Sequence, residues 1–389
     1  MEENVKRMNV LVLGNSGAGK STLIRAISNT QIQTGVGEGN TQKISIYDSQ
    51  TWPLRCIDTK GFEYSKREQM ATIKQVHKFT KEQVSKSETD LENSVGIDAV
   101  WYCIEGTARR TFSYNIEMMN KSIKKWKNVP VFAVITKSYS IVDIDENIQA
   151  VREAFAKNPE VNLQRIIPVV AQAYVISDGT VVEPMGIEQL CELTLDCSEE
   201  AKAISEENRK RMILEQKRYS ANALTIASTT AGVIIGAVPI SFADSLILVP
   251  LETALTKGIL KIYGVEFSGD VITSLVGSTA ITNVARAALS ALKIIPNIAG
   301  SVLNAVVAGF FVSALGEAII ALSEAIYLGK ISPEQAENVV SFVTDKVKES
   351  PVFSFMVNYI EKNAKKLEGK SAKEIYTSVN KALKESNKD

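Results

Sequence analysis

The clearest chemical signal in this sequence is a short glycine-rich segment, GNSGAGKS, which runs from Gly14 to Ser21. Its spacing, a glycine, four residues and then Gly-Lys-Ser, is that of a phosphate-binding loop. Glycines let the backbone curl so that successive N–H groups point at phosphate oxygens, and the following helix adds its positive end. Lys20 supplies a cation for the β- and γ-phosphates, and the Ser21 hydroxyl can ligate Mg²⁺. The residues expected to hold the phosphates are Asn15, Ser16, Gly17, Ala18, Gly19, Lys20, Ser21 and Thr22.

A second segment, DTKG, has the residues that would complete such a site. Asp58 ends the apolar run LRCID, where a carboxylate can hold the Mg²⁺ shell, and the N–H of Gly61 can touch a γ-phosphate. Thr41 precedes the apolar run KISIY and can ligate Mg²⁺ only while triphosphate is bound. Thr34 and Thr30 are alternatives, and Thr41 is favoured because it abuts the next strand. The expected metal ligands are Ser21, Thr41 and Asp58, and the expected catalytic residues are Lys20, Thr41 and Gly61.

The elements around these residues predict an α/β unit. Short β-branched or aromatic runs bounded by turn residues predict strands at 9–13, 43–47, 54–57, 99–104, 131–135 and 166–170. Polar stretches with helical periodicity lie between them near 20–28, 65–86, 113–127, 145–157 and 186–195. Alternation of strands and helices predicts a doubly wound, mostly parallel sheet with helices on both faces, and an all-helical region follows it.

In the order of its motifs, the chain resembles the translation-factor-like P-loop GTPases, particularly the Era-like branch. The resemblance covers residues 8–195 and implies GTP and GDP as ligands, with Mg²⁺ as cofactor. In that family a strand ends in [NT]KxD, and here VFAVI is followed by Thr136, Lys137, Ser138 and Tyr139. The resemblance implies that Thr136, Lys137 and Ser138 contact the base, and that Ala171 offers its backbone N–H in the position of a later family motif.

Tyr139 departs from the family pattern, because it stands where the guanine-reading Asp is expected. Guanine then loses two charge-assisted hydrogen bonds, each worth about 1.5–3 kcal/mol. Asp143 or Asp145 could substitute, although the spacing does not show it. GTP remains the favoured ligand, and an ATPase with an altered base pocket is an alternative.

The expected reaction is slow hydrolysis of the β–γ phosphoanhydride. Phe62 follows the DTKG segment, where many GTPases place a Gln that orients the attacking water. Arg109 and Arg110 are candidate charge stabilisers, although solvated loop cations are the plainer interpretation. Era-like members with an apolar residue in this position often take the missing group from a partner or a dimer, which makes a homodimer one expectation.

Composition changes sharply after the predicted GTPase domain, residues 1–197. Residues 198–218 carry 11 charged residues in 21 and predict a solvated linker helix. Residues 219–330 carry 11 charges in 112, with small residues among apolar ones, and 331–389 return to mixed charge. We expect 219–389 to be an all-helical domain with an apolar, small-residue core and an amphipathic tail.

The uncharged run 219–243 is long enough to span a membrane, as is 294–316. Pro239, Asp244, Pro296 and the many small residues favour a soluble bundle instead, in which small side chains let helices approach closely. The segment also resembles an uncharacterised helical domain fused to Era-like GTPases in bacteria. A membrane-associated, nucleotide-gated binding module is therefore the alternative to a protein that couples nucleotide state to a protein or ribosomal partner.

The remaining composition narrows the classes of chemistry. The chain has 389 residues, no net charge, one histidine and four cysteines. His77 alone excludes a mechanism that needs two histidines, and the cysteines form neither a disulfide framework nor a Cys-x-x-Cys zinc pair. The acidic N-terminus has no signal-peptide pattern, so a cytoplasmic setting is expected.

Overall fold

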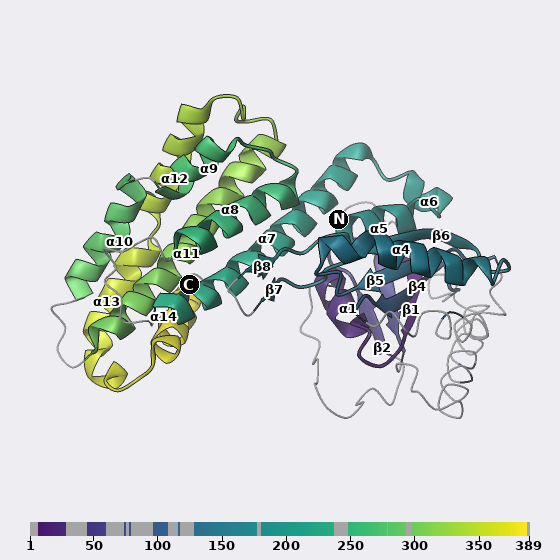
Figure 1. Ribbon diagram of the computed structural model, residues 1–389, viewed down its shortest axis with the longest axis horizontal. Helices are drawn as coiled ribbons and strands as arrows, with labels where there is room; N and C mark the ends of the chain where they lie inside the picture. The colour runs from purple at the N-terminus through teal and green to yellow at the C-terminus, as the bar shows by residue number, and fades with distance from the viewer. Residues whose placement is uncertain are drawn as a thin grey trace. The chain divides into compact units, whose positions relative to one another are not determined.

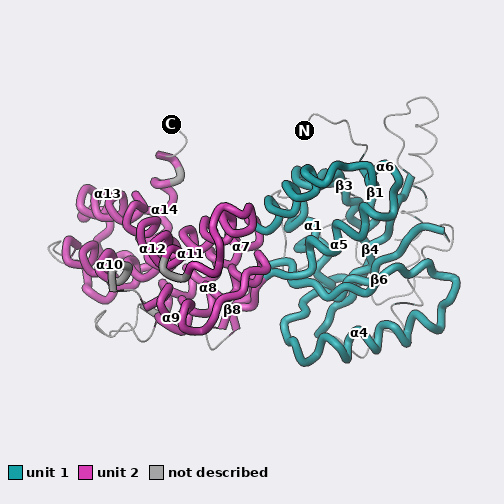
Figure 2. The backbone as a smooth tube through the Cα atoms, turned by 90° about the horizontal axis from the view of Figure 1, so that it is seen from above, with its two compact units in different colours: residues 1–172, 184–217 teal, residues 173–183, 218–389 magenta. Residues whose placement is uncertain are grey.

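The computed structural model describes residues 7–28, 45–59, 74, 78, 96–107, 116, 128–176, 180–236, 248–277, 279–292 and 298–386. It divides the chain into two compact units (Figure 2). The first consists of residues 1–172 and 184–217, and the second consists of 173–183 and 218–389. The second unit therefore takes in a short stretch, 173–183, from within the sequence of the first.

The first unit is built on a six-stranded sheet with the order β2-β3-β1-β4-β5-β6 (Figure 1). Only β2 runs antiparallel to its neighbour, and the other pairs are parallel. The prediction of a mostly parallel α/β sheet is confirmed. The strands are β1 (Met8–Gly14), β2 (Ser45–Asp48), β3 (Leu54–Asp58), β4 (Ala99–Glu105), β5 (Val131–Thr136) and β6 (Leu163–Pro168).

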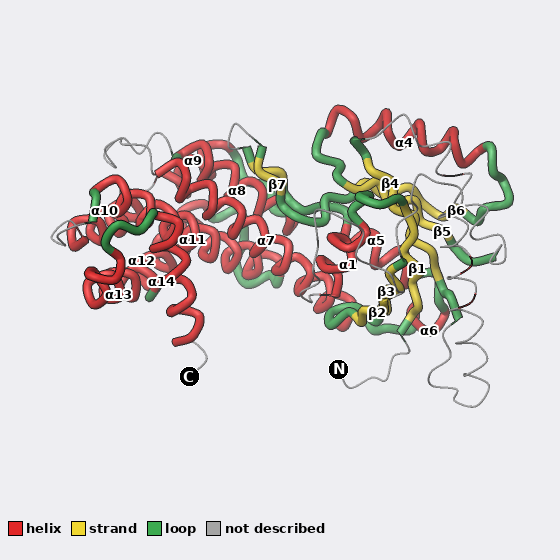
Figure 3. Tube along the Cα trace, turned by 90° about the horizontal axis from the view of Figure 1, so that it is seen from below, coloured by secondary structure: helices red, strands yellow, loops and turns green. Residues whose placement is uncertain are grey.

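Helices cover both faces of this sheet, because successive strand residues point to opposite sides. Tyr102 packs in an apolar cluster with Val151 and Phe155 of α4 (Ile141–Ala156). The neighbouring Trp101 points the other way, where its Nε1 donates a 2.9 Å hydrogen bond to Thr194 Oγ1 of α5 (Ile187–Leu195). Figure 3 shows α4 beside one side of the sheet and α5 with α1 (Lys20–Ser28) beside the other.

Two elements in this unit, β6 and α4, begin clearly before their predicted starts. β6 begins at Leu163 because it pairs in parallel register with β5, Val131 opposite Leu163, and such pairing leaves no local signal. α4 begins at Ile141, one turn before the predicted start. Most of the predicted helices 65–86 and 113–127 lies outside the described residues, although Lys74, Lys78 and Ile116 are helical.

The charged segment 198–218 differs from the single solvated helix that its composition predicts. It contains α6 (Glu199–Lys202) and the first part of α7 (Glu206–Gly236). Residues up to Lys217 belong to the first unit, and from Arg218 onward α7 belongs to the second. Met212 and Gln216 are buried, so this part of α7 packs one face against the first unit.

The second unit is a helical bundle with a two-stranded sheet of β7 (Tyr174–Val175) and β8 (Val181–Val182), which the sequence patterns did not predict. Its longest helix after α7 is α11, which packs against α8, α10, α12, α13 and α14. The helices are α8 (Val249–Tyr263), α9 (Gly269–Gly277), α10 (Thr279–Leu292), α11 (Gly300–Tyr327), α12 (Ala336–Glu349), α13 (Val352–Leu367) and α14 (Ala372–Ser386).

Glycines sit where α7 crosses α11. A Cβ on Gly316 would lie 2.5 Å from Cγ2 of Thr225, and one on Gly309 would lie 2.5 Å from Cγ2 of Val233. These helices therefore approach closely only because the side chain is missing. This is the close approach that the small residues of the segment predict.

Within the described part of the chain, α11 alone is long and apolar enough to cross a membrane by length and composition. Its best window has a mean hydropathy of 2.2, and 83% of that window is buried inside the protein. The core helix of a soluble protein meets the same criteria, so the helix is weak evidence for a membrane span.

Candidate functional site

The glycine-rich loop lies between the carboxyl end of β1 and the first residue of α1. Gly14 has φ +145°, and a Cβ there would meet the carbonyl oxygen of Cys103 at 2.4 Å. Gly17 and Gly19 have φ of +80° and +79°, a region that L side chains rarely adopt. The sequence therefore has glycine at each position where this backbone path requires it.

Lys20 lies across the loop that precedes it. Its Nζ donates to the carbonyl oxygens of Gly14, at 3.1 Å, and of Asn15, at 2.9 Å. The side chain is almost fully buried, with 7% of the residue exposed. A buried ammonium held by two neutral carbonyls still carries its whole charge, so the loop has a positive centre that suits an anion.

Ser21 and Asp58 bring two oxygens together beside this lysine. Ser21 Oγ lies 3.4 Å from Asp58 Oδ2, and Asp58 Oδ1 is buried with no hydrogen-bond partner among the described residues. Burial raises the pKa of the Asp58 carboxyl, while the Lys20 charge and the Ser21 hydrogen bond act to lower it. A hydroxyl and an open carboxylate oxygen are hard oxygen ligands, so the residues present fit Mg²⁺.

The strand end after β5 is attached directly to the phosphate loop. Thr136 Oγ1 donates a 2.8 Å hydrogen bond to the carbonyl oxygen of Ala18 and lies 3.2 Å from that of Ile104. Gly19 also packs on Thr136, since a Cβ there would lie 3.3 Å from the Cβ of Thr136. The Thr at the first position of the TKSY segment thus links the predicted base-binding and phosphate-binding segments.

The rest of the TKSY segment is held at the carboxyl edge of the sheet. Ser138 is buried, its N–H donates to the carbonyl oxygen of Val169 at 3.3 Å, and its Oγ donates to that of Ile135 at 2.8 Å. Ala171 is half-buried and follows Val170, which forms an isolated bridge with Met185. Because β5 and β6 are parallel neighbours, Ala171 and the TKSY segment lie at the same edge.

Several predicted residues lie outside the described part of the chain. These include the proposed switch threonine, the glycine of the DTKG segment and the candidate arginines: Thr30, Thr34, Thr41, Gly61, Phe62, Arg109 and Arg110. Asp143 and Asp145 are described, and both belong to the first two turns of α4. Asp143 is half-buried and Asp145 is exposed.

The sequence patterns missed one charged group at this edge of the sheet. Glu105, the last residue of β4, accepts from Lys137 Nζ at 2.7 Å and from Thr107 Oγ1 at 2.9 Å, both through Oε1. The sequence did offer a signal for this contact: Glu105 ends one predicted strand, and Thr136 and Lys137 end the next. Because the ends of neighbouring parallel strands meet at one edge of the sheet, these side chains could be expected to lie close together.

Comparison with known protein families gives a match within the first unit. The family described as 50S ribosome-binding GTPase matches residues 9–137. No curated protein matches the sequence.

Among solved structures, a probable GTP-binding protein, engB, is 19% identical, with 49% of this chain and 97% of that chain covered and a TM-score of 0.34. NFeoB from S. thermophilus, bound to GDP, aluminium fluoride and K⁺, is 13% identical, with 88% and 99% covered and a TM-score of 0.32. At these low identities and TM-scores, neither neighbour carries an argument about function. The family match and the phosphate loop at the end of β1 together show that the first unit of this chain contains a GTP-binding P-loop GTPase domain.

Proposed function

We propose that this protein is a slow, Mg²⁺-dependent GTPase of Era-like type, whose nucleotide state is passed through its helical unit to a protein or ribosomal partner. The observation that carries the catalytic part is the group formed by Lys20, Ser21 and Asp58. It offers one buried cation at the phosphate loop and two oxygens 3.4 Å apart, with Asp58 Oδ1 still open.

Different residues would bind the phosphates, the metal ion and the γ-phosphate. Backbone N–H groups from Asn15 to Thr22 surround the phosphates, and the Lys20 ammonium neutralises charge on the β- and γ-phosphates. Ser21, Asp58 and Thr41 would hold Mg²⁺, which would stabilise the negative charge of the phosphates when bound. The N–H of Gly61 would contact the γ-phosphate. Slow turnover follows from Phe62, an apolar residue that cannot orient water.

The base-binding part of the proposal rests on the TKSY segment and Ala171. Thr136, Lys137 and Ser138 would line the base at the end of β5, and Ala171 would offer its N–H from the adjacent strand end. Tyr139 has no carboxylate to accept from guanine N1 and N2. GTP is favoured, and modest discrimination against ATP is part of the proposal.

Coupling to the helical unit is supported by contacts of α7 within the first unit. Gln216 is buried, its Oε1 accepts from Trp52 Nε1 at 3.1 Å, and its Nε2 donates to the carbonyl oxygen of Ala26 at 3.2 Å. Ala26 is in the last turn of α1, the helix that begins at Lys20. Trp52 is in the turn between β2 and β3, and β3 ends at Asp58. The Gln216 side chain of α7 therefore contacts both α1, which begins at Lys20, and the turn before β3, which ends at Asp58.

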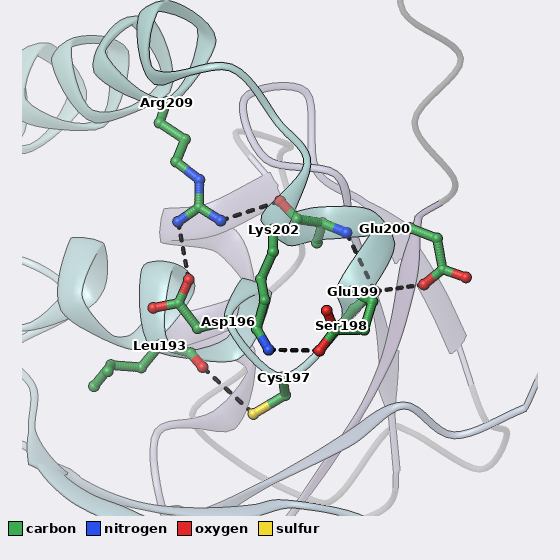
Figure 4. A network of polar contacts seen from close by, with 9 residues as sticks. Leu193, Asp196, Cys197, Ser198, Glu199, Glu200, Lys202 and Arg209 are labelled. Carbon is green, nitrogen blue, oxygen red and sulfur yellow. Dashed lines mark hydrogen bonds and ion pairs between the residues drawn. The ribbon is translucent and has the colours of Figure 1, made fainter.

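The start of α7 is fixed by a further polar network (Figure 4). Arg209 donates to Asp196 Oδ1 and to the carbonyl oxygen of Ala201, each at 3.0 Å. Ser198 caps α6 by accepting from the N–H of Ala201 at 3.3 Å. α7 is a single helix that continues into the second unit. We therefore expect a displacement of Gln216 to move the part of the helix that belongs to the second unit.

Burial of the most apolar helix supports the proposal that the protein is cytoplasmic and not inserted in a membrane. Among the described residues α11 is the helix that is long and apolar enough to span, yet 83% of its most apolar window is already covered by protein. Insertion into lipid would require the bundle to open and give up those contacts.

Calorimetry with GTP, GDP and ATP, with Mg²⁺ and with chelator, tests the proposed function. Wild-type protein should bind GTP and GDP, and the Lys20→Ala variant should lose triphosphate binding with its fold intact, judged by circular dichroism. Lys157→Ala, which removes an exposed lysine of the same unit, is the matched control and should bind as wild type does. Unchanged GTP affinity in a folded Lys20→Ala protein would refute the assignment.

A further inference from the structure

The Lys137 side chain has one ion-pair partner among the described residues, and it is Glu105. Lys137 Nζ and Glu105 Oε1 are 2.7 Å apart, and the two side chains are 34% and 30% exposed. Thr107 Oγ1 donates to the same oxygen at 2.9 Å, which holds the carboxylate in place from a second side. The Glu105 carboxylate is therefore held by two donors, Lys137 and Thr107, although the ion pair is partly open to solvent.

The backbone on both sides of this pair is fixed. Glu105 lies opposite Thr136 in the β4–β5 register, and Gly106 N–H donates to the carbonyl oxygen of Thr136 at 2.9 Å. Lys137 has φ +54°, and it is the only described residue other than glycine with positive φ. Bulky residues adopt that conformation only where the surrounding structure imposes it, and such residues cluster at functional sites.

An exposed ion pair contributes little to folding, because solvent screens it. A strained backbone and a doubly held carboxylate are not needed to stabilise such a pair. They do limit where the four-carbon stem of Lys137 lies, in the residue that follows Thr136, and the Thr136 side chain is hydrogen-bonded to the phosphate loop. A stem held in one place offers an apolar surface on which a flat ring can pack without the cost of ordering that side chain.

We propose that Glu105 is a positioning residue for nucleotide binding: it holds Lys137 so that the lysine stem supports the purine ring of the bound nucleotide. The inference rests on the proposed function, because it needs a nucleotide in the site. It assigns to Glu105 no contact with the base edge. Support of a ring is blind to its substituents, so Glu105 should matter equally for GTP and ATP.

The test measures GTP, GDP and ATP affinity by calorimetry, together with single-turnover hydrolysis at saturating GTP. Glu105→Ala should weaken the binding of all three nucleotides by the same factor, about two- to fivefold, because one charged contact that orders the lysine is lost. Hydrolysis at saturation should stay within about twofold of wild type, since the phosphate contacts are untouched. Glu105→Gln, which keeps an acceptor for Lys137 and Thr107, should recover part of the affinity.

A double-mutant cycle with Lys137→Ala separates positioning from a structural role. If Glu105 acts through the lysine, Glu105→Ala should have no further effect in the Lys137→Ala background. Glu199→Ala removes the carboxylate of another exposed ion pair, with Lys202, and should leave nucleotide affinity unchanged.

Three results would overturn the inference. Additive effects in the cycle would mean that Glu105 acts independently of Lys137, and tighter binding by Glu105→Ala would mean that the pair holds the lysine away from the nucleotide. A loss confined to GTP would make Glu105 a direct reader of the guanine edge. No GTP binding by the wild type would instead refute the proposed function, so the two failures are distinguishable.

Discussion

At the scale of single residues, two buried groups of opposite charge, Lys20 and Asp58, lie at the phosphate loop among the described residues. Lys20 is 7% exposed and Asp58 is 3% exposed, and the Lys20 charge offsets only part of the desolvation that raises the pKa of the Asp58 carboxyl. Asp58 keeps one oxygen without a partner among the described residues, which is costly in a buried carboxylate unless something binds there. Mg²⁺ is the ligand that we propose for it.

The first prediction concerns base choice at Tyr139. Tyr139→Asp restores the carboxylate that accepts two hydrogen bonds from guanine, each worth about 1.5–3 kcal/mol. The ratio of ATP to GTP dissociation constants should therefore rise tenfold or more, as measured by calorimetry. Tyr139→Phe is the control, because it leaves the ring and adds no acceptor. A wild-type ratio already as steep as that of the variant would contradict the prediction.

The second prediction concerns Glu252, a buried carboxyl in the first turn of α8 with no hydrogen-bond or ion-pair partner among the described residues. It is 5% exposed, and burial raises its pKa to about 8 from the ordinary 4.5. Between these values the folded state keeps a proton that the unfolded state has lost. Stability therefore falls as pH rises through this window, by about 1.4 kcal/mol per unit from this group.

Glu252→Gln should remove that pH dependence. Denaturant unfolding at pH 5, 7 and 9 should show the variant increasingly more stable than wild type as pH rises. Glu266→Gln, an exposed neighbour beyond the end of α8, should follow the wild-type curve. Parallel curves for wild type and Glu252→Gln would show that the carboxyl is solvated or paired.

At the scale of elements, the important contacts are those that α7 makes before it leaves the first unit. Lys217 forms a 2.9 Å ion pair with Glu188 of α5, and Gln216 joins the end of α1 to the turn between β2 and β3. That turn is itself joined to α1, because Ser49 Oγ donates to the carbonyl oxygen of Ile27 at 2.6 Å. A change in either element must therefore strain or release the contacts of Gln216.

The third prediction tests this connection. Gln216→Leu keeps most of the volume but leaves the Trp52 indole N–H buried without a partner, at a cost of about 1–3 kcal/mol. Nucleotide binding should survive, while the nucleotide-dependent difference in the helical unit should shrink. Hydrogen exchange of α8 and α11, compared between GDP and a non-hydrolysable GTP analogue, measures that difference.

Gln149→Leu, on the exposed face of α4, is the matched control and should preserve the exchange difference. A full difference in Gln216→Leu would rule out this side chain as the connection. If the wild type shows no exchange difference between GDP and the GTP analogue, the proposed coupling is wrong, while the proposal of GTP binding stands.

At the scale of the whole molecule, the question is what covers the apolar helices of the second unit. α11 is covered by the neighbouring helices of the bundle, and its glycines allow α7 to approach. Ile226 and Ile234 of α7 are among the exposed apolar side chains that the structure describes, at 65% and 67%. Scattered exposed apolar residues of this kind are ordinary on soluble proteins.

The fourth prediction follows from that burial. Untagged full-length protein should remain in the high-speed supernatant without detergent, and light scattering after size exclusion should show a monomer or small oligomer. Release from the membrane pellet only by detergent, and not by salt or carbonate, would mean that the apolar helices insert. The nucleotide-gated membrane module would then replace the soluble protein as the proposed function.

The local part of the site could be predicted from sequence because its signals lie in single segments. The path of the phosphate loop depends on glycines at positions 14, 17 and 19, and L residues cannot follow it at low cost. The alternation of strands and helices likewise follows from short-range patterns, and it is sufficient to predict a mostly parallel sheet. Asp58 is likewise recognised from its own segment, DTKG, although its position beside Ser21 depends on the pairing of β1 with β3.

The remaining features depend on residues far apart in the chain, which no local pattern specifies. Lys137 and Glu105 meet because β4 and β5 are neighbours, and Gln216 reaches Trp52 across 164 positions. Residues 173–183 join the second unit although they interrupt the sequence of the first. Local sequence patterns are enough to predict the phosphate loop and the fold class, because backbone conformation and periodicity are local. Tertiary structure decided which charges meet and where the units divide, because only the folded chain brings those groups together.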